Sequence, residues 1–239
     1  MMIKHPCYPR RAALWPLGLL VTGLLFDACT ATQQKEETAD LPIEQAILND
    51  PESFYYIDFA NYQAKVASLP IGVFDSGTGG LTVLDALVCF DEFNNENGAV
   101  GADGMADFAK ERFIYLADQA NMPYGNYHSA GNSELLVEHI IKDVQFLLGN
   151  KYYSSQEAAA FHGDKEKIKA IVIACNTATA YGVEKVREFV VKAGLDIPVI
   201  GVIDAGARGV LENFEIDESG TIGVFATVGT IASNGYERT

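Results

Sequence analysis

The stretch from Ile171 to Ala174 constrains the fold most, because it is a short, mostly β-branched apolar run that leads into a cysteine. Such a run predicts a strand buried on both faces of a parallel sheet. The residues after Cys175 have helical character, so we expect a helix to follow the thiol closely. Ligands of open α/β sheets bind at the carboxyl ends of strands, and helix N-terminal amides favour a thiolate. A free cysteine is more often a small buried hydrophobe, so Cys175 alone leaves a structural and a catalytic role open.

The order strand, loop, helix recurs along the body of the chain. Strands are expected at 69–74, 112–117, 169–174, 197–203 and 221–226. Helices are expected at 81–90, 134–148, 178–186 and 204–213, with a helix or two in 41–69. The alternation predicts an α/β fold, an open parallel sheet flanked by helices. The polar segments 91–110 and 149–166 are expected to be surface insertions.

The net charge, and the spacing of cysteine, histidine and acidic residues, exclude several classes of partner and site. The 239 residues carry a formal net charge of −15, which argues against nucleic acid or anionic membrane surfaces as partners. The cysteines at 7, 29, 89 and 175 form no CxxC pair, and the four histidines are scattered, so we expect no metal site. The acids of 91–110 lack the alternating spacing of a calcium loop.

The N-terminus resembles a bacterial lipoprotein signal. Basic residues precede an apolar run at 14–26, which is followed by Ala28 and Cys29. We expect lipidation at Cys29 and a location in the bacterial cell envelope, either lipid-anchored or periplasmic. The alternatives are an uncleaved leader, a mistaken start codon and a cytoplasmic location.

A glycine-rich loop and a proline turn are the other features that suggest a site. Residues 75–80, Asp-Ser-Gly-Thr-Gly-Gly, join a strand to a helix and can offer backbone amides to an anion. Their spacing fits neither a dinucleotide fingerprint nor a P-loop, and the alternative is that Asp75 merely caps the helix. The turn Pro123-Tyr124-Gly125 can aim a phenol and a backbone amide at a site.

Taken in order, these loops resemble those of the glutamate racemase family, within the aspartate/glutamate racemases. The resemblance covers roughly residues 70 to 239. It rests on the loop at 75–80, Asp118 with the turn at 123–125, Ala174 to Thr177, Gly201 to Ala207, and Ile222 to Val224 with Thr227, Thr230, Ser233 and Tyr236.

The resemblance implies a cofactor-independent amino-acid racemase that interconverts L- and D-glutamate by two-base proton transfer at Cα. It implies Cys175 as one base, with Asp75 as a candidate to assist it. As partners we expect glutamate or a similar amino acid, and a second copy of the chain in a homodimer. The residues implied to bind substrate are Asp75, Ser76, Tyr124, Gly125, Asn176, Thr177, Thr227 and Thr230.

The resemblance also implies a second cysteine in a Cys-Thr-His motif, which this sequence lacks. We therefore expect a C-terminally truncated racemase whose second domain is only begun. The alternatives are a catalytically inactive remnant, an amino-acid-binding half-site module, and a second chain that supplies the missing cysteine. The expected division is 1–28 signal peptide, 29–69 tether and N-terminal extension, 70–205 first α/β domain, and 206–239 start of the second domain.

Overall fold

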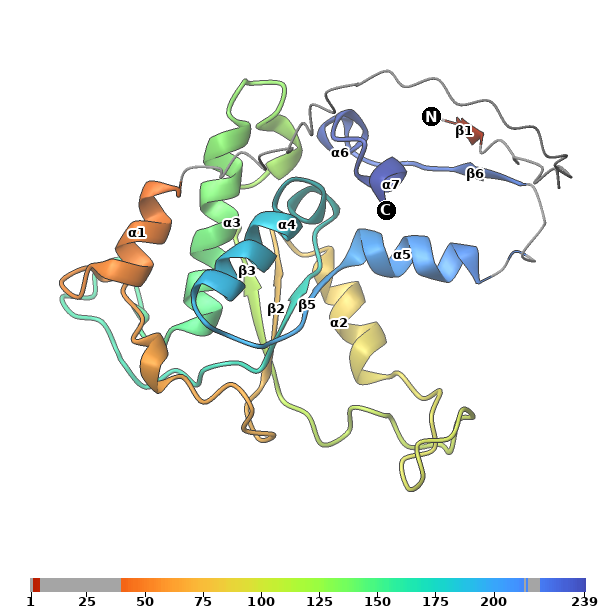
Figure 1. Ribbon diagram of the computed structural model, residues 1–239, viewed down its shortest axis with the longest axis horizontal. Helices are drawn as coiled ribbons and strands as arrows, with labels where there is room; N and C mark the ends of the chain where they lie inside the picture. The colour runs from red at the N-terminus through yellow and green to blue at the C-terminus, as the bar shows by residue number, and fades with distance from the viewer. Residues whose placement is uncertain (1, 5–39, 213, 215–219) are drawn as a thin grey trace, which may run out of the picture.

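The computed structural model describes residues 2–4, 40–212, 214 and 220–239 (Figure 1). Most of the expected signal peptide and the expected lipidation site Cys29 lie outside the described residues, so those expectations stay predictions. Within the described ranges, none of the helices combines the length and the apolar character needed to cross a membrane.

The centre of the protein is a parallel sheet of four strands in the order β3-β2-β4-β5. In the register of the sheet, Asp75 pairs with Ala117 and Phe74 pairs with Ile173, so the carboxyl ends of three neighbouring strands meet at one edge. This arrangement confirms the α/β prediction. The strands are β2 (Ile71–Asp75), β3 (Phe113–Ala117), β4 (Ala170–Ile173) and β5 (Val199–Gly201).

Helices follow the strands as the sequence predicts, with ends that differ by a few residues. In the described part of the N-terminal extension, residues 40–69, there are one helix and one 3₁₀ turn, which agrees with the expectation for 41–69. The helices are α1 (Pro42–Asn49), α2 (Gly80–Val88), α3 (Ser133–Leu148), α4 (Asn176–Lys192), α5 (Val202–Leu211), α6 (Val228–Ala232) and α7 (Gly235–Arg238), and the 3₁₀ turns are η1 (Phe59–Asn61) and η2 (Tyr124–Asn126).

The two faces of the sheet are covered differently, as Figure 1 shows. Because side chains alternate along a strand, Phe74 and Ile173 face the large core formed with α1, α3 and α4. Val73 and Val172 face the opposite side, where they pack against Leu84 and its neighbours on α2. Both faces are therefore apolar, which is why β2 and β4 read as continuous hydrophobic runs.

The fifth expected strand forms, but it lies outside the parallel sheet. It is β6 (Thr221–Gly223), which pairs antiparallel with β1 (Met2–Lys4) in a separate two-stranded sheet. The ends of β6 are exposed and only its central residue is partly buried, the pattern of a strand covered on one face. The apolar segment at 221–226 therefore predicts a strand correctly without identifying its partner.

The N-terminal extension packs into the body of the protein. Ile43 and Ile47 of α1 are buried in the large core. Glu44 of α1 is fully buried and its Oε2 lies 2.9 Å from Nζ of Lys185 on α4. The hydroxyl group of Tyr62 donates to the carbonyl oxygen of Ile168 at 2.9 Å. These contacts make residues 42–62 part of the folded body.

Candidate active site

Cys175 lies at the edge where the carboxyl ends of β2 and β4 meet. It is the N-cap residue of α4, and its Sγ accepts a hydrogen bond from the backbone N–H of Ala178 at 3.4 Å. The Oγ of Ser76, which directly follows β2, lies 3.4 Å from the same sulfur. The thiol side chain is 7% exposed. The fold therefore brings together two predicted site residues that are 99 positions apart.

The environment of Cys175 holds its thiol in the protonated form. Burial raises the pKa of Cys175 and is the largest influence on it. The hydrogen bonds from Ser76 and from the Ala178 N–H lower this pKa, while the negative charge of Asp75 raises it. The helix N-terminus thus acts in the direction expected from the sequence, but desolvation outweighs it.

Asp75, the last residue of β2, connects the strand to the glycine-rich loop. It is 6% exposed, and its Oδ2 accepts the backbone N–H of Gly80 at 2.8 Å. A Cβ at position 80 would lie 2.6 Å from Cβ of Asp75 and 2.9 Å from Cβ of Ala174, so only glycine fits there. Asp75 therefore holds the start of α2 and also places its charge near the thiol.

Three threonine hydroxyl groups form a cluster beside the start of α4. Oγ1 of Thr177 lies 2.9 Å from Oγ1 of Thr230 and 3.3 Å from Oγ1 of Thr227. Thr227 also caps α6 by accepting the N–H of Thr230 at 3.3 Å. The resemblance implies all three as substrate-binding residues, and the fold brings them together.

The remaining polar contacts tie the C-terminal helices to α4. The hydroxyl of Tyr236 donates to Oδ1 of Asn176, a predicted site residue, at 2.7 Å. The hydroxyl of Tyr181 donates to the carbonyl oxygen of Gly229 at 3.0 Å. A Cβ on Gly229 would lie 2.6 Å from the carbonyl oxygen of Gly125, so η2 and α6 are in close backbone contact. Gly125 therefore borders the threonine cluster through its backbone.

Tyr124 is placed differently from the other predicted site residues. Its side chain is 1% exposed and belongs to the large core. Its phenol oxygen lies 2.6 Å from Oδ2 of Asp118 and 2.7 Å from Oδ2 of Asp143 on α3. The phenol is therefore occupied by two carboxyl groups in the core.

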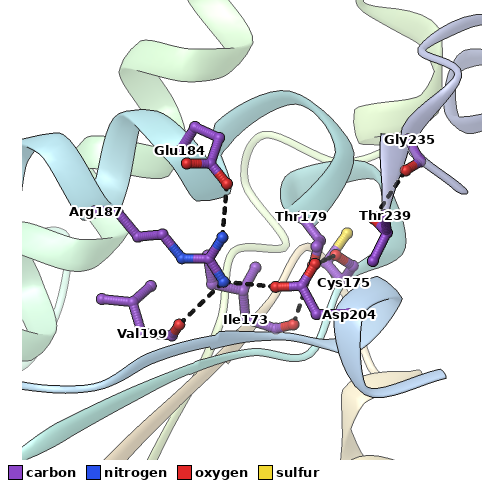
Figure 2. Close-up of polar contacts among 9 residues, drawn as sticks. All are labelled: Ile173, Cys175, Thr179, Glu184, Arg187, Val199, Asp204, Gly235 and Thr239. Atoms are coloured by element: carbon purple, nitrogen blue, oxygen red, sulfur yellow. Dashed lines mark hydrogen bonds and ion pairs between the residues drawn. The ribbon is translucent and has the colours of Figure 1, made fainter. Parts of the chain in front are cut away.

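A second polar network, drawn together with Cys175 in Figure 2, joins α4 to β5 and α5. Arg187 lies 2.6 Å from Glu184 and 2.5 Å from Asp204. Thr179 donates to the carbonyl oxygen of Cys175 at 2.9 Å. A cavity of about 620 Å³ opens beside this network, between α4, α5 and α7, and its lining does not include Cys175. Because the charges of Arg187 are already paired, we assign this network a structural role.

The structure also shows which partners Cys175 has for metal or proton chemistry. Across the described residues, histidine, cysteine and acidic side chains nowhere gather in threes in a way that could hold a metal ion. The other described cysteine, Cys89, follows the last residue of α2, at the opposite end of that helix from Gly80. The described part of the chain therefore brings no second thiol to Cys175.

Sequence reasoning missed two residues next to the predicted site. Asp143 is a buried acid on the apolar face of α3. An acidic residue among the apolar positions of a helix is unusual, and this is the sequence signal that points to it. Tyr115 on β3 donates to the carbonyl oxygen of Gly77 at 3.2 Å. The sequence pattern predicts only that Tyr115 lies in a strand.

The sequence is similar to proteins of known activity. Residues 150–239 match the sequence profile of the Asp/Glu/Hydantoin racemase family. The chain is 36% identical over 167 residues to a glutamate racemase of Enterococcus faecalis, covering 70% of this chain and 45% of that protein. It is 33% identical over 171 residues to a glutamate racemase of a Sulfurihydrogenibium species, covering 72% of this chain and 49% of that protein. The chain thus spans about half the length of the curated relatives it matches.

Solved structures of similar proteins include glutamate racemases. One is an isoform from Bacillus anthracis, which is 32% identical with a TM-score of 0.49 and covers 71% of this chain and 47% of that chain. Another is the enzyme of Francisella tularensis in complex with D-glutamate, which is 31% identical with a TM-score of 0.44 and covers 72% of this chain and 47% of that chain.

Proposed function

We propose that this chain, a relative of the aspartate and glutamate racemases, takes part in the cofactor-independent interconversion of L- and D-glutamate by proton transfer at Cα. The observation that carries the proposal is the placement of Cys175 Sγ 3.4 Å from Ser76 Oγ at the carboxyl edge of the sheet. Ligands bind at this edge in open α/β folds. A thiol in this place suits proton transfer, because it can be tuned by its neighbours between thiol and thiolate.

The surrounding groups suit a substrate with one ammonium and two carboxylate groups. The charge of Asp75 favours the ammonium group nearby, and the cation in turn favours the Cys175 thiolate by offsetting the effect of burial. We assign the hydroxyls of Thr177 and Thr230, and the backbone amide of Gly125 that borders their cluster, as donors for the carboxylates. Donors placed in advance stabilise the negative charge that develops when the Cα proton leaves.

In the proposed step, Cys175 first loses its thiol proton to water as the substrate ammonium group binds, and the thiolate then forms an S–H bond as the Cα–H bond breaks. The electron pair stays on Cα and its carboxylate, and an acid on the opposite face of Cα then supplies a proton. The described residues place no second thiol near Cys175, so we propose that another part of the protein or a partner copy supplies that acid. The alternative function is an amino-acid-binding half-site without catalysis.

The test is exchange of the Cα hydrogen in heavy water. The purified chain is incubated separately with L- and D-glutamate, and the loss of the Cα–H signal and the enantiomer ratio are followed by NMR and chiral chromatography. We expect exchange of one enantiomer with little racemisation, and its loss in Cys175→Ala. Efficient racemisation by the purified chain would show that this chain, or a second copy of it, already supplies the second acid. Binding of glutamate without exchange of either enantiomer would overturn the catalytic proposal and support the half-site.

A further inference from the structure

Three buried polar side chains meet at the phenol of Tyr124, next to the candidate site. Oδ2 of Asp118 and Oδ2 of Asp143 lie 2.6 Å and 2.7 Å from the same phenol oxygen. The side chains of Asp118 and Asp143 are 8% and 7% exposed. In such a place polar atoms must find their partners within the protein.

The number of protons decides how this cluster is built. A phenol carries one proton and an ionised carboxylate carries none. One hydroxyl cannot donate two short hydrogen bonds in different directions, so a second proton must lie between the phenol oxygen and a carboxyl group. Of the two carboxyl groups, Asp118 is better placed to carry no proton, because the side-chain Nδ2 of Asn121 donates to both of its oxygens at 3.0 Å.

We infer that a protonated Asp143 donates to the phenol oxygen of Tyr124, that Tyr124 donates to Asp118, and that this chain of two protons makes Tyr124 a positioning residue for the threonine cluster. The link to the cluster is the next residue along the chain. A Cβ on Gly125 would lie 3.0 Å from Oγ1 of Thr227, and the Gly125 carbonyl oxygen is in close contact with Gly229. A shift of the phenol would therefore move the surface on which α6 rests.

The electrostatics support the proton on Asp143. Burial first and the charge of Asp118 second raise the pKa of Asp143 to about 8, against the opposing effect of the Tyr124 hydrogen bond. Asp143 therefore keeps its proton at neutral pH and loses it in mildly alkaline solution.

Several other titratable groups on the elements that pack against α3 have partners of their own. His139 on α3 lies against the ring of Tyr127, and Lys142 pairs with Glu138. Glu44 of α1 pairs with Lys185 of α4. On β2 and β3, Asp75 accepts from Gly80 and Tyr115 donates to Gly77. The pKa of Asp143 is set by burial, by the charge of Asp118 and by the Tyr124 hydrogen bond, and none of the cations named here shifts it.

The inference rests on the proposed function only in taking the threonine cluster to be part of a ligand site. The decisive measurement is therefore made without substrate. The amide signals of Gly125, Gly229 and Thr230 are followed by ¹H–¹⁵N NMR as the pH is raised from neutral to alkaline. The full chain is compared with Asp143→Asn, which can still donate to the phenol but cannot ionise. The matched control is Asp85→Asn, at an exposed aspartate of α2.

We expect the three amides to shift with one midpoint, near pH 8, in the wild type and in Asp85→Asn. In Asp143→Asn that transition should be absent while the spectrum at neutral pH stays close to that of the wild type. An unchanged transition in Asp143→Asn, or no transition in the wild type, would overturn the inference.

A second measurement links the proton chain to ligand binding, with glutamate as the probe. In the wild type, affinity should fall across the Asp143 transition by more than in Asp143→Asn, whereas Tyr124→Phe should weaken binding about tenfold at neutral pH. Equal affinities of Tyr124→Phe and the wild type would overturn the positioning role. If the wild type binds no glutamate, the proposed function fails, and the substrate-free NMR transition still decides whether the proton chain exists.

Discussion

Oγ1 of Thr177 and Oγ1 of Thr230 lie 2.9 Å apart although 53 residues separate them in the chain. Thr177 lies in the first turn of α4, whereas Thr230 belongs to α6, which follows the separate strand β6. Both residues are buried. The contact therefore joins the parallel sheet to the C-terminal segment at the candidate site.

The first prediction is that Thr230→Val destabilises the protein by about 1 kcal/mol, because it keeps the side-chain shape and removes one partner of a buried hydrogen bond. The measurement is the midpoint of urea unfolding at neutral pH. Thr82→Val is the control, at an exposed threonine on α2, and should change the free energy of unfolding by less than about 0.5 kcal/mol. Equal effects of the two variants would show that the Thr177–Thr230 contact contributes nothing to stability.

The second prediction concerns the Asp75 carboxylate, whose charge raises the pKa of Cys175. Asp75→Asn keeps an oxygen that can accept the Gly80 N–H but removes the charge, so the thiol pKa should fall. A lower pKa raises the thiolate fraction at any pH below it, and the thiolate is the reactive form. Alkylation of Cys175 in mildly alkaline solution, quantified by peptide mass spectrometry, should therefore be faster than in the wild type.

Ser76→Ala gives the opposite change in the same alkylation assay. The Ser76 hydrogen bond lowers the pKa of Cys175, so its loss should raise the pKa and slow the reaction. Cys89 serves as the internal reference, since it lies at the far end of α2. Faster alkylation in both variants would indicate a general opening of the site and would contradict the electrostatic explanation.

Much of the fold could be predicted from local sequence. The apolar runs of β2 and β4 identify strands buried on both faces, and the parallel order then requires their carboxyl ends to meet. The proximity of Ser76 and Cys175 follows from that topology. Only the resemblance to a family predicts the threonine cluster, because the residues after 220 have no pattern that places them against α4.

Other features depend on contacts that sequence patterns do not reveal. The apolar residues at 221–226 predict a strand, but its pairing with Met2–Lys4 joins segments far apart in the sequence, and no local pattern indicates it. The pKa of Cys175 depends on the balance between burial and a helix N-terminus, and only the folded structure shows that burial prevails. The direction of the Tyr124 phenol depends on Asp143, a residue on another element.

The fourth prediction concerns the buried ion pair between the N-terminal extension and α4. Glu44 is fully buried and lies 2.9 Å from Lys185. Glu44→Gln leaves the Lys185 charge mostly buried without its counter-charge, which should destabilise the protein by about 3 kcal/mol. Glu138→Gln is the control, because its pair with Lys142 is one-third exposed and should be worth less than about 1 kcal/mol. The measurement is the midpoint of urea unfolding of each variant. Similar losses of stability in Glu44→Gln and Glu138→Gln would contradict the prediction.

The last prediction is the pH dependence of stability that Asp143 confers. Its pKa is raised from 3.8 to about 8 on folding, so the folded protein holds this proton more tightly than the unfolded chain does. The stabilisation from this group is therefore complete below about pH 4, declines as the pH rises, and is lost above about pH 8, with a slope of at most about 1.4 kcal/mol per pH unit. The measurement is the free energy of unfolding of the wild type relative to Asp143→Asn across this range, which cancels the contributions of other titrating groups. A difference that stays constant with pH, or that grows in favour of the wild type as the pH rises, would contradict a protonated Asp143.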